Sequence, residues 1–416
     1  MSAALAGMPG TDAPGRGATA VPAAGATVRD PRLDVARGMA MFIILLAHTP
    51  GNAWTLWIPA RWGFSDATEM FVFCSGMASA IAFGRTFERA GWVLGAARVV
   101  FRCWQVYWAH VCMLMATLAL TIALTQSDLG TRNYWGQLNL WPLIVDSDNW
   151  SNAENILGFL TLRYVPNYFD ILPMYLVVLA MMPVFVALAT RSMVLAAAAS
   201  LGLWLLAQEG VAAVLGLPHL TLPAEPWSDR TWFFNPFGWQ LVFFTGFAFM
   251  RGWLPRPPVR AWLVALALGV VLLNVLYSNI GVRVLDLDFA REWRSANAAW
   301  FDKSSFGILR YGQFLALAYL AWVAMGDGGR RLVWRGRGVL DRAANGLVAQ
   351  ITKVGQQSLA VFVFSMAYAR FQGFLLDVLG RDAGTVALVN LSGFALLVAV
   401  AHGVAWFKAS PWKARR

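Results

Sequence analysis

Charged residues are scarce in this chain. Of its 416 residues, 13% are Asp, Glu, Lys or Arg, about half of the roughly 25% that is typical of soluble globular proteins. Apolar residues make up 58% of the chain and aromatic residues 14%. The shortage of charge excludes an ordinary cytosolic enzyme, and the apolar content excludes a disordered chain.

Cysteine and histidine are also rare, with 3 and 4 residues respectively. Cys74, Cys103 and Cys112 lie in apolar stretches, and none has the spacing of a CxxC pair. We therefore expect buried thiols and no metal site or redox pair. The sequence also has no His/Cys cluster, no Walker loop and no GxGxxG after a strand. It predicts no metal and no bound cofactor.

Long apolar runs are what the sequence has in abundance. About 20 helical residues cross the hydrocarbon of a bilayer, and within lipid only helices or closed barrels satisfy their backbone hydrogen bonds. Continuous runs of this length predict helices. We expect an all-α integral membrane protein with about ten transmembrane helices, over residues 33–53, 65–84, 98–125, 169–189, 193–214, 236–253, 259–278, 306–325, 353–373 and 385–407.

Positive charge is distributed unevenly between these runs. With the N-terminus in the cytoplasm, the inner flanks hold 22 of the 33 Lys and Arg residues but only 6 of the 22 acidic residues. Cytoplasmic loops of membrane proteins carry such an excess, so we expect both termini to be cytoplasmic. Membrane topology then accounts for the net charge of +11, and no nucleic-acid partner is needed.

The chain is expected to consist of one membrane domain between two tails. Residues 1–29 are rich in Ala, Gly, Pro and Thr, which predicts a disordered cytoplasmic tail. Residues 30–408 form the ten-helix domain, and residues 409–416 form a basic cytoplasmic tail.

Three outer loops are long enough to suggest a function of their own, near residues 126–168, 215–235 and 279–305. Tryptophans occur in these loops and after the first apolar run. They fit an interfacial aromatic belt, but several lie far from any expected helix end, which a belt does not require. The alternative is a surface that stacks on sugar rings. The candidates for binding a glycan are Trp54, Trp62, Trp141 and Trp232.

The first apolar run contains two ionisable residues on one helix face. Arg37 and His48 are eleven positions apart, which at 100° per residue is 20° beyond three full turns, with a rise of about 16 Å. An ionisable residue in a membrane span is a functional candidate by default. Asp34 lies one turn from Arg37 and can pair with it. The alternatives are a snorkelling arginine and a hydrogen-bonded histidine at a helix end.

The second apolar run begins with acidic residues at the depth of His48. Asp66 and Glu69 are one turn apart, and a carboxylate beside a histidine can fix its tautomer and stabilise the imidazolium. We expect Glu69 to orient His48, with Asp66 nearby. The alternative is an acidic residue favoured by the helix N-terminus. Ser75, two turns deeper, is a further polar candidate, or permits close helix packing with Gly76.

Arginines also lie at the inner end of the third run and the outer end of the eighth. Arg98 and Arg102 could hold phosphates with bidentate hydrogen bonds, although each also fits the ordinary excess of positive charge in inner loops. Arg310 is a further ionisable residue within an expected span and is therefore also a functional candidate.

Five segments together resemble a known family. They are RDPRLDVARG at 29–38, HTPGN at 48–52, GFSDATEMFVFCSGMASAIAFGR at 63–85, NPFGWQLVFFTG at 235–246 and GQQSLAVFVFS at 355–365. The Arg–His pair resembles the signature of the acyltransferase-3 superfamily of membrane acyltransferases. The whole set, over residues 29–370, resembles its OpgC branch, the osmoregulated periplasmic glucan succinyltransferases.

The resemblance implies a function and two substrates. It implies a multi-pass protein of the bacterial inner membrane that moves a succinyl group from cytosolic succinyl-CoA, a co-substrate, to periplasmic glucan hydroxyls. The site would open to the cytoplasm for the donor and to the periplasm for the acceptor. The positions that match the signature are Arg37 and His48, and His48 is expected as general base. The residues expected at the acyl-CoA site are Arg37, Asp34, Ser75, Arg98 and Arg102. Arg310 would be a candidate for binding the carboxylate of the succinyl group.

Other functions fit parts of the pattern. The chain could be an O-acetyltransferase of another cell-surface polysaccharide, a glycan transporter or exporter, or a scaffold. Transporters often contain paired repeats with broken helices, and no repeat is evident here. A direct transfer and a covalent acyl-His48 intermediate both remain open, as does the oligomeric state.

Overall fold

The computed structural model describes residues 30–146 and 151–413. The tail expected over residues 1–29 lies outside the described residues, and so does the end of the expected C-terminal tail, residues 414–416. Within the described ranges the protein is built from helices and contains no strand. The expectation of an all-α protein is therefore confirmed for that part of the chain.

The first helix, α1 (Pro31–His48), has clear signals at both ends. Asp30 is the N-cap, and its side chain accepts a hydrogen bond of 3.0 Å from the backbone N–H of Arg32. Pro31 occupies the first turn, where its missing N–H costs nothing. The helix ends at Thr49, which is extended. A short turn η1 (Ala53–Trp57) and α2 (Pro59–Trp62) follow.

The second and third apolar runs form two arms of one long element, α3 (Ala67–Gln126). Gly91 separates the arms with a φ of 81°, a left-handed conformation that glycine adopts without steric cost. The chain reverses direction here. The two arms pack so closely beside the turn that a Cβ on Gly95 would lie 2.3 Å from the Phe87 ring. The two arms coincide with the segments expected over 65–84 and 98–125.

The remaining apolar runs also lie on helices. The longer helices that follow α3 are α5 (Ile171–Arg191), α6 (Met193–Leu206), α8 (Pro236–Arg251), α9 (Ala261–Leu276), α12 (Ile308–Met325), α13 (Val339–Gln356), α14 (Ser358–Leu379) and α15 (Ala383–Ala409). Short elements fill the connections: η2 (Gly136–Leu138), η3 (Trp141–Leu143), α4 (Asn152–Leu160), α7 (Glu209–Val214), α10 (Asn279–Arg283), α11 (Asp288–Ala296), η4 (Ala298–Phe301), η5 (Asp327–Leu332) and η6 (Pro411–Lys413).

Six helices in the described part of the chain are long and apolar enough to cross a bilayer by length and composition. They are Ala67–Gln126, Ile171–Arg191, Ala261–Arg283, Ile308–Met325, Ser358–Leu379 and Ala383–Lys413. The chain is thus a multi-pass membrane protein. The count of about ten crossings and the cytoplasmic placement of both termini stay predictions.

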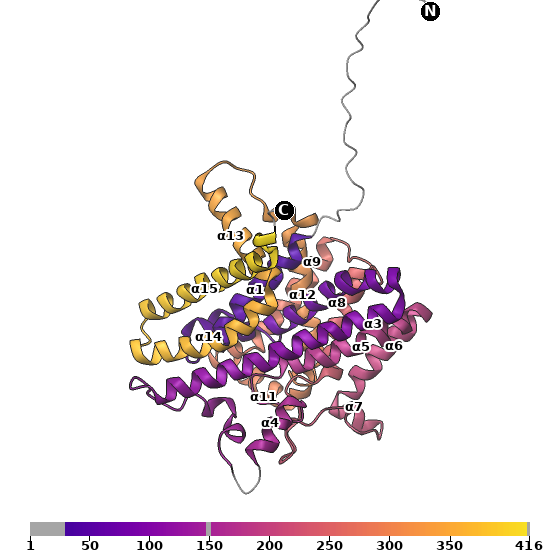
Figure 1. Cartoon of the computed structure of the whole chain (residues 1–416). Helices are drawn as coiled ribbons and strands as arrows, with labels where there is room; N and C mark the ends of the chain where they lie inside the picture. The colour runs from indigo at the N-terminus through magenta and orange to yellow at the C-terminus, as the bar shows by residue number, and fades with distance from the viewer. Residues whose placement is uncertain (1–29, 147–150, 414–416) are drawn as a thin grey trace, which may run out of the picture.

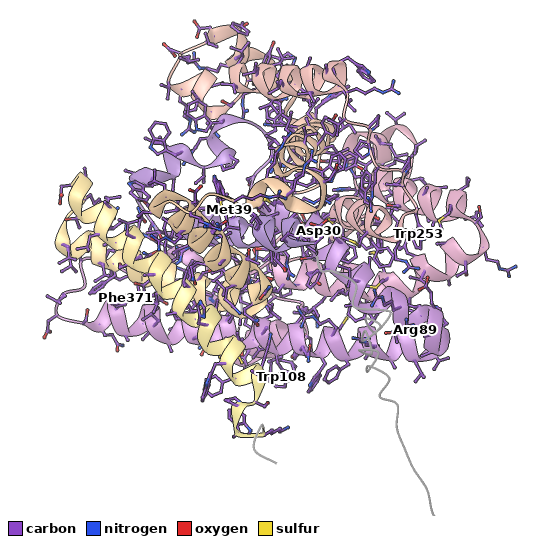
Figure 2. The ribbon with its side chains drawn as sticks, turned by 90° about the horizontal axis from the view of Figure 1, so that it is seen from above. Asp30, Met39, Arg89, Trp108, Trp253 and Phe371 are labelled. Atoms are coloured by element: carbon purple, nitrogen blue, oxygen red, sulfur yellow. The ribbon has the colours of Figure 1, made fainter. Side chains whose placement is uncertain are left out.

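The two ends of the bundle differ. In Figure 1, α13 and the C-terminus lie at one end, while the short helices α4, α7 and α11 lie at the other. α13 was not expected, since most of its residues fall between the expected runs 306–325 and 353–373. It packs against α1 with almost no space between the backbones: a Cβ on Gly355 would lie 1.8 Å from the Asp34 carbonyl oxygen. α1 is held in the centre of the bundle, where Figure 2 shows its N-cap Asp30.

Candidate active site

α1 and α14 lie alongside each other and run in the same direction. Near the start of each helix, Arg37 Nη2 donates a hydrogen bond to Ser358 Oγ. At the far end, Thr49 Oγ1 donates to Gln372 Oε1 over 3.0 Å. The two contacts are separated by similar lengths of each helix, about 18 Å on α1 and 21 Å on α14. Arg37 and the end of α1 therefore both lie against α14.

A groove with a volume of about 930 Å³ runs between α14 and the second arm of α3. α15 contributes Val404 and Lys408 to its wall. In Figure 2, where the structure is seen from above, α15 extends past Phe371 on α14 towards Trp108 on α3. The wall of the groove is cationic at one end and apolar along the rest of its length.

One end of the groove is cationic. Arg37, Arg102 and Lys408 line it together, and the charges of both arginines act on Lys408. Two amides position these side chains, because Arg102 donates to Gln105 over 3.0 Å and Lys408 donates to Gln357 over 2.6 Å. The described residues that line the groove include no Asp or Glu. This end can therefore bind an anion such as a phosphate.

The rest of the groove is largely apolar. From Ser358 to Phe371 the wall formed by α14 rises about 20 Å, and its other members are mainly Ala, Val, Leu and aromatic residues. The facing wall on α3 is formed by Gln105, Ala109, Cys112, Ala116 and Leu120. A flexible, weakly polar chain attached to a phosphorylated head group fits this arrangement.

His48 is held by the backbone of its own helix. Its Nδ1 lies 2.9 Å from the Ile44 carbonyl oxygen. Because a carbonyl can only accept, Nδ1 carries the proton, and in the neutral ring Nε2 is the basic nitrogen. The expectation that Glu69 orients His48 is therefore replaced: the carbonyl of Ile44 fixes its tautomer.

Tyr168 and Arg370 complete the surroundings of His48, and the sequence analysis identified neither. The Tyr168 ring packs edge-on against the His48 ring, with centroids 6.2 Å apart, and the Arg370 guanidinium lies 4.9 Å from the centre of the Tyr168 ring. Tyr168 has a φ of 70°. Such strain in a non-glycine residue occurs often at functional sites. The composition of residues 126–168 gave no signal for it.

Glu69 and Asp66 belong to a separate ionic cluster with Arg310 and Lys303. Glu69 is fully buried; its Oε1 accepts a 2.8 Å hydrogen bond from Arg310 Nε, and its Oε2 accepts one of 2.7 Å from the Asp66 backbone N–H. Asp66 caps α3 through Thr68 and pairs with Lys303 Nζ at 2.6 Å. The cluster joins α3 to the segment at the start of α12.

The cluster is electrostatically compensated. Burial alone would raise the pKa of Asp66, but the charges of Lys303 and Arg310, together with hydrogen bonds from Lys303 and Thr68, hold it well below its usual range. Arg310, the candidate for binding an acyl carboxylate, is occupied by Glu69. Asp66 and Lys303 lie near enough to act on His48 through their charges. The cluster therefore borders the site, but Glu69 does not bond the imidazole, because its two oxygens bond Arg310 and the Asp66 backbone.

Three of the expected donor-binding residues lie away from the groove. Ser75 is buried, and the adjacent Gly76 packs against the backbone of α8, which is the close-packing alternative. Arg98 donates to Thr86 over 2.5 Å on the exposed surface. Asp34 is buried at the contact of α1 with α13. Of the expected set, Arg37 and Arg102 line the groove, and Lys408 and Gln357 were missed.

The four tryptophans have different environments. Trp232 is only 3% exposed and packs with Val165 and Ala224, so it presents no face to a sugar and its assignment was wrong. Trp62 is exposed and stacks on Trp57. Two others complete the set: Trp54 packs against Phe394, and exposed Trp141 contacts Trp135.

These features define the class of protein: a multi-pass helical membrane protein with a groove between its helices and a histidine beside a buried arginine. The chain belongs to the OpgC protein family, whose sequence model matches residues 29–409. The match points to a role in modifying osmoregulated periplasmic glucans. No curated protein and no solved structure was found to match the chain. Among the described residues, no group of three or more His, Cys, Asp or Glu side chains could hold a metal ion.

The ionic cluster predicts a stability effect. Glu69→Gln leaves Arg310 buried without its counter-charge, and removing one partner of a buried pair costs about 3–5 kcal/mol. We expect a clear fall in Tm of the detergent-purified protein, partly restored by adding Arg310→Met. Glu88→Gln is the matched control, because Glu88 forms an exposed pair with Arg251. A Glu69→Gln protein with an unchanged Tm would contradict this assignment.

Proposed function

We propose that the protein is an inner-membrane O-acyltransferase that moves a succinyl group from cytosolic succinyl-CoA to hydroxyls of osmoregulated periplasmic glucans. The observation that carries the proposal is the groove along α14, which is cationic at the end near Arg37 and follows α14 towards the end of α1, where His48 lies. Membership of the OpgC family supports the glucan as acceptor. The succinyl group rests on the resemblance described above.

The charge distribution suggests how the donor binds. The phosphates of coenzyme A cannot enter hydrocarbon at low cost, so they would stay with Arg37, Arg102 and Lys408 at the cytoplasmic end. The pantetheine arm would follow the apolar wall of α14, which is long enough to bring the thioester to the level of His48. The donor would thus cross most of the membrane without moving its charged part.

The tautomer of His48 suggests the chemistry. Nε2 would accept the proton of a glucan hydroxyl as its oxygen attacks the thioester carbonyl. The new C–O bond forms, the tetrahedral intermediate collapses with cleavage of the C–S bond, and the thiolate takes the proton from Nε2 to leave as free coenzyme A. The Ile44 carbonyl accepts the hydrogen bond of Nδ1–H throughout, and so stabilises the imidazolium.

The acceptor would approach from the end where the short helices lie. Trp62 and Trp141 expose aromatic faces there, in segments expected on the periplasmic side. An O-acetyltransferase would need the same groove and histidine. Comparing acetyl-CoA with succinyl-CoA as donor distinguishes it from a succinyltransferase. A glycan transporter or exporter would need no thioester chemistry, and the groove lies between α14, the second arm of α3 and α15 in a chain whose sequence has no evident repeat.

His48→Ala is expected to lower acyl transfer by about 10²–10⁴-fold, the usual contribution of a general base. The assay uses detergent-purified protein, succinyl-CoA and a glucan, and measures release of free thiol together with mass-spectrometric detection of the succinyl ester. His402→Ala is the matched control, because His402 bonds Gln350 away from the groove. Normal transfer by a folded His48→Ala protein would reject the assignment. A native protein whose thiol release is unaffected by glucan would instead favour a carrier or scaffold.

Arg37→Gln is expected to raise the KM for succinyl-CoA by about 10- to 100-fold, since hydrogen bonds to charged groups contribute roughly 1.5–3 kcal/mol. Arg98→Gln removes the same charge from the same side but outside the groove, and should leave the KM unchanged. Titration of the donor at fixed glucan concentration measures both. Equal effects of the two substitutions would show that net charge, and not the groove, binds the donor.

A further inference from the structure

Arg370 is a buried cation beside the groove. Arg370 is 7% exposed. It lies on α14 one turn beyond Ala367 and two turns beyond Val363. Both of these residues line the groove, and side chains three and seven positions apart lie on one side of a helix. The charge of Arg370 also acts on His48. Arg370 is not itself one of the residues that line the groove, but it lies at the level of His48 and contacts Tyr168, which packs against the His48 ring.

Arg370 has no acidic partner among the described residues, which distinguishes it from the other arginines nearby. Arg132 pairs with Asp377 at 2.7 Å, and Arg310 pairs with Glu69. Arg370 instead lies 4.9 Å from the ring of Tyr168. A cation–π contact of this kind compensates only part of the cost of burying a charge.

A buried, unpaired guanidinium is suited to an anion that arrives with the substrate. The two cations of the neighbouring cluster, Arg310 and Lys303, are compensated by Glu69 and Asp66. Arg37 and Arg102 lie at the opposite end of the groove. Arg370 is thus the cation near His48 whose charge is available to a ligand, and its planar fork matches a carboxylate.

We propose that Arg370 binds the distal carboxylate of a dicarboxylic acyl group while the thioester of that group lies beside His48. The proposal rests on the proposed function and deepens it, because it assigns a residue to the choice of acyl group. Tyr168 holds the guanidinium from one side and packs against His48 from the other, so one strained residue positions both the carboxylate site and the base. An acetyl group would leave Arg370 without a ligand.

The test compares donors with and without the carboxylate. In Arg370→Gln, kcat/KM for succinyl-CoA should fall about 100-fold, in line with the loss of a buried charge-assisted pair, while kcat/KM for acetyl-CoA changes less than about 3-fold. Arg370→Lys keeps the charge without the fork and should have an intermediate ratio. Arg291→Gln is the control, since Arg291 forms only exposed pairs with Asp286 and Asp288.

A second comparison needs no substitution and therefore no folding control. The native protein should transfer the succinyl group about 100-fold faster than the same group esterified as its methyl ester. Equal loss on both donors in Arg370→Gln, or equal turnover of the acid and its ester by the native protein, would overturn the proposal. A substitution that affects transfer only to an anionic glucan, and not to a neutral one, would assign Arg370 to the acceptor and overturn it too.

The failure of the proposed function has a different signature. A native protein that transfers no acyl group from any thioester contradicts the proposed function, and the assignment of Arg370 falls with it. A native protein that transfers succinyl and acetyl groups equally well keeps the proposed function and overturns the carboxylate site alone.

Discussion

Charge is costly inside a bilayer, and the positions of charges in this chain determine much of its structure. Within the bundle, Glu69 and Asp66 are compensated by Arg310 and Lys303. Arg37 lies at one end of a groove, where solvent and a charged ligand can reach it. Arg370 differs from these residues, because it is buried and has no acidic partner among the described residues. An uncompensated buried charge is destabilising, so its presence points to a functional role. Burying such a residue in a membrane helix bundle lowers the stability of the folded protein.

The parallel contact of α1 with α14 connects these positions. α14 meets Arg37 through Ser358 at one end and the residue after His48 through Gln372 at the other. The same helix forms one wall of the groove and carries Arg370. The cationic end of the groove and His48 are thereby fixed on one frame, at a separation that the proposed donor arm would cover. The close backbone contact of α13 with α1 holds this frame at the end of the bundle where α13 lies.

Local sequence could predict part of this arrangement. The helices follow from apolar runs, and the common face of Arg37 and His48 follows from the helical repeat. The partners of these residues could not be predicted, because they come from distant parts of the chain: Arg310 is 241 residues from Glu69, and Ser358 is 321 residues from Arg37.

Other features could not be predicted because nearby groups, or the backbone conformation, decide which contacts a side chain makes. Glu69 has the depth expected of a partner for His48, but the capping box of α3 and Arg310 use both of its oxygens, while the carbonyl of Ile44 was already within reach of the imidazole. Tyr168 depends on a left-handed backbone conformation that composition does not reveal. Lys408, the last residue of the expected membrane domain, was not identified as a candidate, because only the path of α15 brings it to the groove.

The central claim is that the donor lies in the groove along α14, and Cys112 offers a direct test. Its side chain is exposed, contrary to the expectation of a buried thiol, and lines the groove on the second arm of α3, whereas Cys74 is buried in the bundle. Saturating succinyl-CoA should slow the alkylation of Cys112 by a maleimide, measured by peptide mass spectrometry on the detergent-purified protein, and leave Cys103 unaffected. Alkylation of Cys112 at the same rate with and without bound donor would contradict the account.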